Sequence, residues 1–184
     1  IYPMVNPVIR EILVEDIADP GSVLSLILFD PAARDIFIRN FNGIHGLWDD
    51  RDGFKGTHFF WGISPKQKLV PLQLDPAANT LNGGGLSIPL EPAALVRALE
   101  EKQIASSLFM DFLIITFIEG FHAMGGFNQL EYLPLMQDAH VKSLREIGRN
   151  DLADTFASRK TDGLICGMFP FHYDSGIDLL GMQY

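Results

Sequence analysis

IASSLFMDFLIITFIEGF, residues 104–121, is apolar over nearly all of its length and carries two acidic side chains, Asp111 and Glu119. On a helical wheel its apolar side chains occupy almost the whole circumference, which is typical of a helix that is buried on all sides. The run is about 18 residues long, the lower limit for a membrane span, and a central aspartate costs about 2.5–3.5 kcal/mol on insertion. We therefore predict a buried core helix here and no membrane span.

The ionisable groups of this helix share one narrow stripe of the wheel, formed by Asp111, Glu119 and the following His122. A buried carboxylate needs a partner, a proton or a metal ion. Glu119 and His122 are three residues apart and face each other if the helix continues through Gly120. A carboxylate that orients an imidazole is typical of general acid–base catalysis. The alternative is a frayed helix end at which His122 stabilises the helix dipole, with Asp111 on an exposed part of the helix.

A second histidine, His140, lies in the apolar stripe of a helix predicted over 134–147. If that helix packs antiparallel on the segment 106–121, the His140 ring approaches Asp111 and supplies a second titrating group. The alternative is a hydrogen-bonded core histidine, because a buried imidazole needs partners for its nitrogens.

The segment between these two helices, residues 123–134, is predicted to be a loop. Its polar side chains are Asn128, Gln129, Glu131 and Tyr132. We expect them to bind and position a substrate, because connecting loops commonly carry binding residues. The alternative is an ordinary helix connection with capping side chains.

The remaining segments predict the fold class. Helices are predicted over 7–17, with a strand as the alternative there, and over 32–41, 92–102 and 150–159. Strands are predicted over 22–29, 57–63, 68–74 and 163–169, and loops over 42–56 and 79–85. The runs on either side of the polar turn 64–67 predict a β-hairpin, and Pro71 moves its second strand to a sheet edge. Because strands concentrate in the first half and helices in the second, we predict an α+β fold. It has a small, partly antiparallel sheet with this hairpin, and the helices of the C-terminal half pack on one face.

Composition limits the class of protein. The 184 residues are 47% hydrophobic and 20% charged, as in a folded chain, and we expect a single domain over 1–184. The formal net charge of −9 disfavours nucleic acid and anionic membranes as partners. One cysteine, Cys166, excludes a disulfide framework, and the scattered histidines predict no metal site and no cofactor. The chain starts at Ile1, so we expect a processed protein or a piece of a longer one, and without signal-peptide features we expect a cytoplasmic location.

These features together predict an enzyme, or a catalytic domain, that acts on a small polar metabolite by general acid–base chemistry. His122 is the predicted base, Glu119 its orienting partner, and Asp111 or His140 the second titrating group. The alternative is a non-catalytic binding or assembly domain, as a homo-oligomer or as a subunit of a larger complex. The predicted hairpin at a sheet edge favours that alternative.

Overall fold

The computed structural model describes residues 7–123, 127–162, 170–173 and 176–179. Its helices are α1 (Pro7–Ala18), α2 (Val23–Phe29), α3 (Pro31–Phe41), α4 (Pro92–Glu100), α5 (Leu108–Phe112), the π-helix η1 (Leu113–Ile118), α6 (Phe127–Glu146) and α7 (Asn150–Ala157). Its strands are β1 (Phe60–Ile63), β2 (Leu69–Pro71), β3 (Gln73–Asp75), β4 (Thr80–Gly83), β5 (Leu86–Pro89), β6 (Ile104–Ser106), β7 (Pro170–Tyr173) and β8 (Gly176–Leu179). The predicted α+β class is confirmed.

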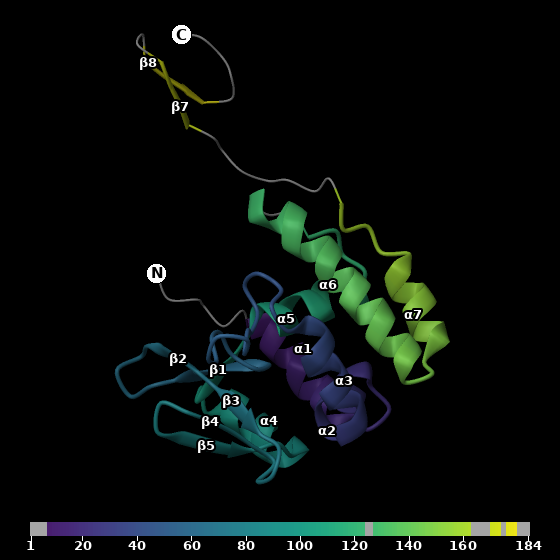
Figure 1. The fold of residues 1–184 in the computed structure, drawn as a ribbon. Helices are drawn as coiled ribbons and strands as arrows, with labels where there is room; N and C mark the ends of the chain where they lie inside the picture. Colours follow the sequence, from purple (N-terminus) through teal and green to yellow (C-terminus); the bar gives the residue numbers. More distant parts are fainter. Residues whose placement is uncertain (1–6, 124–126, 163–169, 174–175, 180–184) are drawn as a thin grey trace.

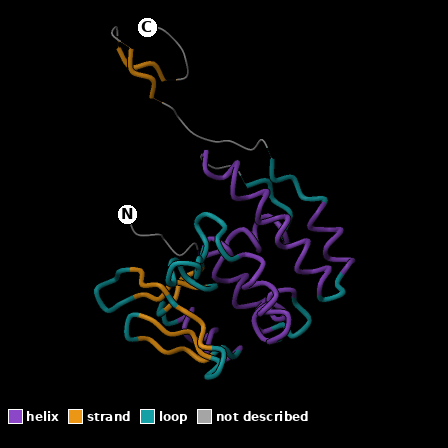
Figure 2. The backbone as a smooth tube through the Cα atoms, in the orientation of Figure 1, coloured by secondary structure: helices purple, strands orange, loops and turns teal. Residues whose placement is uncertain are grey.

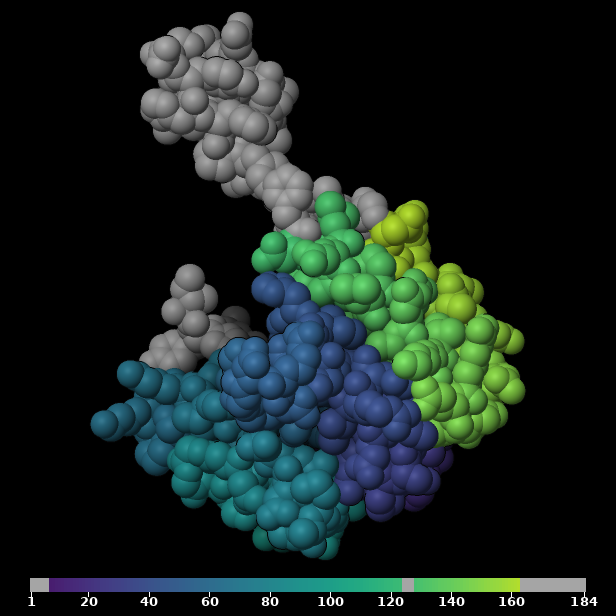
Figure 3. Space-filling model, in the orientation of Figure 1, coloured from purple at the N-terminus to yellow at the C-terminus, as the bar shows by residue number. Residues whose placement is uncertain are grey.

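Strands β1–β6 gather on one side of the molecule and the pair α6–α7 lies on the other, with α1–α3 between them (Figure 1, Figure 2). The space-filling view has the same order, with the blue segment of α3 and the loop after it between the teal strands and green α6 (Figure 3). One hydrophobic core runs through these parts, and Phe37, Trp48 and Phe109 are among its buried residues. The helices and sheets therefore bury a shared interior.

Strands β1–β6 form two antiparallel sheets, with the strand orders β2-β1-β6 and β3-β4-β5. The predicted hairpin is confirmed, because β1 pairs with β2 in a register that places Ile63 opposite Leu69 and Trp61 opposite Pro71. β2 is an edge strand, as Pro71 predicted, since proline lacks the N–H that an inner strand needs. β7 pairs with β8. The strand predicted over 163–169, with Cys166, lies outside the described residues.

The strand predicted over 22–29 is wrong, because this segment forms α2. Ser22 caps the helix by accepting the N–H of Ser25 at 2.9 Å. Leu24, Ile27 and Leu28 then recur at helical spacing and are buried. A good N-cap and a buried helical face outweigh the strand preference of the β-branched residues in the run. The helices predicted from Pro7 and Pro31 are confirmed as α1 and α3.

The apolar stretch 104–121 forms three elements in place of one helix. Ile104–Ser106 is the strand β6, which pairs with β1, so a helix from Ser106 is wrong. Ser107 caps α5, and from Leu113 the helix widens into η1, whose inner residues are buried. The predicted burial is therefore confirmed. Among the described residues no helix combines the length and apolar character needed to cross a membrane.

α6 begins at Phe127, so the prediction that it starts at Pro134 and follows a loop is wrong. Pro134 lies inside the helix, where its missing N–H removes one backbone hydrogen bond. The helix ends at Glu146, within one residue of the predicted end, and Gly148 follows with a φ of 78°. α7 packs against α6, and α6 packs against α3.

The predicted loop over 79–85 is also wrong, because it contains β4 and the turn into β5. Gly84 and Gly85 have φ values of 57° and 84° and form a two-residue hairpin turn, a type that needs positive φ at both positions. At Gly83 a side chain would collide with the carbonyl of Pro71 in β2, so glycine lets β4 approach β2 closely. The loop predicted over 42–56 is confirmed as turns with isolated bridges.

Candidate functional site

The predicted pair of Glu119 and His122 is not formed. η1 ends at Ile118, and Gly120, with a φ of 77°, turns the chain out of the helix. Both side chains are exposed, and among the described residues no hydrogen bond or ion pair joins them. The condition on which the pairing was predicted, a helix that continues through Gly120, is therefore not met.

Arg159 occupies the end of η1. Its Nε donates to the carbonyl of Phe117 at 3.1 Å, and its Nη2 donates to the carbonyl of Ile118 at 2.9 Å. The guanidinium lies against Gly120, where a side chain would collide with it. A cation at a helix C-terminus stabilises the helix dipole. Arg159 thus has the position that the sequence analysis considered for His122.

His140 lies in the core inside a cage of five phenyl rings. The rings belong to Phe37, Phe41, Phe109, Phe117 and Phe156, and their centroids are 4.5–5.8 Å from that of the imidazole. Neither ring nitrogen has a hydrogen-bond partner. Burial lowers the pKa of His140 to about 3, which keeps the ring neutral at pH 7. His140 is therefore a core residue, as the alternative interpretation expected, but the hydrogen bonds that this interpretation expected are not formed.

Asp111 faces away from His140. The His140 ring packs on Phe109, which precedes Asp111 by two residues and so lies about 200° away around α5. The Asp111 side chain is half-buried, and its Oδ1 is buried without a hydrogen-bond partner. Burial raises the pKa of Asp111, and a hydrogen bond with Ser106 opposes that rise. A carboxylate with a perturbed pKa is a candidate for function on physical grounds.

The four predicted substrate-binding residues lie on the first turns of α6 and point in different directions. Asn128 and Glu131 are exposed, whereas Gln129 is buried and its Nε2 donates to the carbonyl of Ala123. Tyr132 is half-buried, and its ring meets that of Phe112 edge to face with centroids 5.7 Å apart. Tyr132 thus contacts Phe112, the residue that follows Asp111 in the chain. Among the described residues, no hydrogen bond, ion pair or ring contact links Glu119, His122 or His140 to Asp111 or Tyr132.

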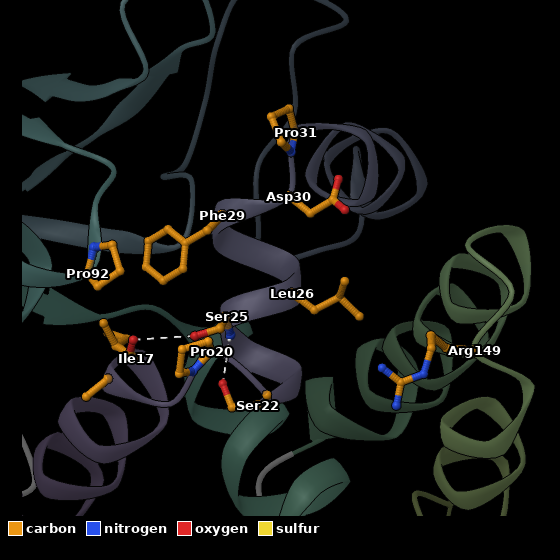
Figure 4. Close-up of a pocket in the computed structure, with 12 residues that line it drawn as sticks. Ile17, Pro20, Ser22, Ser25, Leu26, Phe29, Asp30, Pro31, Pro92 and Arg149 are labelled. Carbon is orange, nitrogen blue, oxygen red and sulfur yellow. Dashed lines mark hydrogen bonds between the residues drawn. The ribbon is translucent and has the colours of Figure 1, made fainter.

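A groove of about 740 Å³ follows one face of α2, and we call it the α2 groove. Ser22, Ser25, Leu26 and Phe29 form its floor, because residues three and four apart share one face of a helix. The walls come from the turn after α1, from Pro31 and Pro92, and from Arg149 between α6 and α7. In Figure 4, Phe29 points toward Pro92 and Leu26 points toward Arg149. The groove thus has a floor of two serines and the apolar Leu26 and Phe29, and prolines in its walls.

Most polar groups of the α2 groove already have partners. Ser22 Oγ donates to the carbonyl of Asp16 at 2.6 Å, and Ser25 Oγ is 3.2 Å from the same oxygen. Asp30 Oδ1 accepts two N–H groups at the start of α3. Arg149 is the one cation among the described lining residues, and it forms an exposed ion pair with Asp151 at 3.3 Å. Such a pair contributes about 0–1 kcal/mol, so a ligand can compete for the guanidinium.

A second hollow, of about 290 Å³, lies between α1 and α4, and its lining includes Arg10, Glu11 and Glu100. Neither hollow is lined by any of the eight predicted site residues. In the part of the chain that the structure describes, no group of three or more His, Cys, Asp or Glu side chains could hold a metal ion.

Comparison of the chain with protein-family models, curated proteins and solved structures finds no match.

The α2 groove is not among the sites predicted from the sequence. Asp19–Gly21 contains a turn and Asp30 caps α3, so both segments have the local sequence of ordinary connections between helices. One signal was present, because Ser22 as an N-cap predicts a helix with Leu26 and Phe29 on one face. Arg149 carried no signal, since its place in the groove depends on how α6 packs against α3.

Proposed function

We propose that this chain is a ligand-binding domain whose site is the α2 groove, and that its ligand is a small molecule with an apolar body and one carboxylate. The observation that supports it most is the α2 face left uncovered in a groove of about 740 Å³. Pockets for small molecules are typically about 300–1,000 Å³, mostly apolar, with few polar groups that fix orientation. The α2 groove fits that description.

The chemistry of the lining residues selects the ligand class. Leu26, Phe29 and Pro92 offer apolar surface to a ring or an alkyl chain. Arg149 offers a planar fork of N–H donors, which matches the two oxygens of a carboxylate. The other charged lining residue, Asp30, is occupied as the N-cap of α3, where the helix dipole compensates its charge. An anionic group on the ligand therefore has one favourable place to bind in the groove, which is the guanidinium of Arg149.

Isothermal titration calorimetry with a matched pair of probes tests the proposal. We expect naphthalene-2-carboxylate to bind and the neutral naphthalene-2-carboxamide to bind at least tenfold more weakly. A charge-assisted hydrogen bond contributes about 1.5–3 kcal/mol, and about 1.4 kcal/mol is a factor of ten. Arg149→Gln is expected to remove the preference for the carboxylate. Leu26→Ala is expected to weaken both probes.

The control variant is Arg145→Gln, because Arg145 is exposed on the same helix end and pairs with the exposed Asp154 without lining the groove. It is expected to bind both probes as the unchanged protein does. If neither probe binds, or if Arg145→Gln and Arg149→Gln weaken the carboxylate equally, the proposal is wrong.

The acid–base enzyme predicted from the sequence is a second candidate, and one observation favours it. Asp111 Oδ1 is buried and unpaired at the junction of α5 with a π-helix, a type of helix that is frequent at functional sites. In that case a substrate binds beside Asp111 and Tyr132 rather than along α2. A titration that perturbs the amides of Asp111 and Tyr132 and leaves those of α2 unchanged would favour the enzyme.

A further inference from the structure

The two sheets meet at residues 57–60, where side chains replace part of the backbone hydrogen bonding. β2 and β3 are separated only by Leu72, and three hydrogen bonds with backbone N–H donors join this stretch to Thr57 and His58. The N–H of His58 donates to the carbonyl of Leu72 at 2.8 Å. The N–H of Leu72 donates to Thr57 Oγ1 at 2.8 Å, and the N–H of Leu74 donates to His58 Nδ1 at 3.0 Å. Two of the three acceptors are therefore side chains.

A kink at Phe59 explains why the imidazole takes this role. Phe59 has a φ of 58°, in the left-handed region that non-glycine residues rarely adopt. The carbonyl of His58 accepts the N–H of Phe60, so it is used within the kink. His58 Nδ1 then serves as the acceptor for Leu74. Leu74 is buried, and its N–H depends on that acceptor.

The hydrogen bond to Leu74 requires a neutral ring. Nδ1 accepts only when the proton of the ring is on Nε2, because both nitrogens of an imidazolium are donors. The ring is buried against Trp48, Phe54 and Phe59, with centroid distances of 4.7–6.2 Å. A second proton on the ring therefore breaks the hydrogen bond and leaves a charge in an apolar setting.

The charged residues of the elements around the ring lie in the preceding loop and in β3. They are Asp49, Asp50, Arg51, Asp52 and Lys55 in the preceding loop and Asp75 in β3. Burial, the larger effect, lowers the pKa of His58 to about 4, and Asp50 opposes it. When the junction opens, water returns the ring to its ordinary pKa near 6.5. Acid therefore favours the open junction.

We propose that His58 is an acid-sensitive latch between the two sheets. A proton on Nδ1 releases the N–H of Leu74 and separates the β3–β5 sheet from residues 57–60 while the helices remain folded. The core imidazole, His140, takes up its proton at lower pH, because it is wholly enclosed.

Amide hydrogen exchange of the whole chain between pH 7 and pH 4 tests the latch. The protection factor of the Leu74 amide is expected to fall by nearly tenfold per pH unit around pH 5 and by roughly 100-fold in total between pH 7 and pH 4, because opening takes up one proton until the closed ring also takes one up. At each pH below 6, Leu74 is expected to be less protected than the helical amide of Leu28. Equal protection of both amides at every pH would mean that only global unfolding exposes Leu74, and it would overturn the proposal.

Two variants and one spectroscopic measurement complete the test. His58→Asn keeps an acceptor oxygen near the position of Nδ1 and does not titrate, so its Leu74 protection is expected to be independent of pH. His58→Leu removes the acceptor, and its Leu74 amide is expected to exchange fast at every pH. The same pH dependence in His58→Asn as in the unchanged protein would contradict the latch. Ring ¹⁵N shifts of the unchanged protein test it independently, because a neutral tautomer with the proton on Nδ1 would also overturn it.

Discussion

His58 and His140 are neutral side chains in the core, and their enclosure makes stability depend on pH. Burial lowers their pKa values from 6.5 to about 4 and about 3. Below pH 6.5 these two histidines take up protons in the unfolded chain but stay neutral in the folded chain. The free energy of unfolding therefore decreases as the pH falls. The expected slope approaches its limit of about 2.7 kcal/mol per pH unit near pH 5, or about 1.4 for each ring, and falls again as the pH reaches 4, where the folded chain begins to protonate His58. Asp16 and Asp111 have the opposite effect on the free energy of unfolding. Burial raises their pKa values, so the folded chain protonates them at a higher pH than the unfolded chain does.

Replacing His140 with leucine should stabilise the protein. The two ring nitrogens of His140 have no hydrogen-bond partners, and an unpaired buried polar group costs about 1–3 kcal/mol. A leucine fills a similar volume without that cost. We expect His140→Leu to raise the free energy of unfolding at pH 7 by about 1–3 kcal/mol and to halve its slope with pH, measured by urea denaturation.

The control for His140→Leu is His45→Leu, because His45 is exposed. It is expected to change the free energy of unfolding by less than about 0.5 kcal/mol at pH 7 and at the lower pH values of the same series. A clear loss of stability in His140→Leu at pH 7 would mean that the imidazole has a favourable role in the cage that the contacts do not reveal.

At the scale of the element, the end of η1 depends on one glycine and one arginine. Gly120→Ala places a side chain against the Arg159 guanidinium at a φ of 77°. The left-handed conformation costs a non-glycine residue about 1–2 kcal/mol, and displacing Arg159 from two carbonyls adds about 1–3 kcal/mol. Gly85→Ala is the matched variant, because Gly85 has a φ of 84° in open space. We expect Gly120→Ala to lose more stability than Gly85→Ala in thermal unfolding, and equal losses would exclude a stabilising role for Arg159.

Element starts with a strong local signal could be predicted from the sequence. Pro7, Pro31 and Pro92 each begin a helix, and the turn over 64–67 joins the predicted strands. Two segments differ from their predicted structure because a local signal outweighs their composition. The cap at Ser22 makes 22–29 helical, and the paired Gly84 and Gly85 make 79–85 part of a hairpin.

The candidate site was less accessible to sequence reasoning. The position of His122 depends on whether the helix continues through Gly120. It also depends on the π-helix η1, which changes the directions of the side chains that follow it and which no pattern in the sequence indicates. The cage of His140 is formed by rings from α3, α5, η1 and α7, so it depends on tertiary packing. Catalytic roles for Glu119, His122, Asp111 and His140 stay predictions.

At the scale of the whole molecule, the α2 groove joins segments that are far apart in the chain. Ile17 and Phe29 come from the first helices, Pro92 from the start of α4, and Arg149 from the corner between α6 and α7. A ligand that contacts all three parts is bound only by the folded chain. Its binding therefore stabilises the fold, by about 2.7 kcal/mol when the ligand is present at 100 times its dissociation constant.

The central claim is that the α2 groove is the binding site, and amide chemical-shift mapping with naphthalene-2-carboxylate tests it most directly. The account predicts that the largest shifts along the titration are those of Ser22, Leu26 and Phe29 and of the Arg149 side chain. Largest shifts at Asp111, Glu119 or His122, or no shift at millimolar probe, would contradict it.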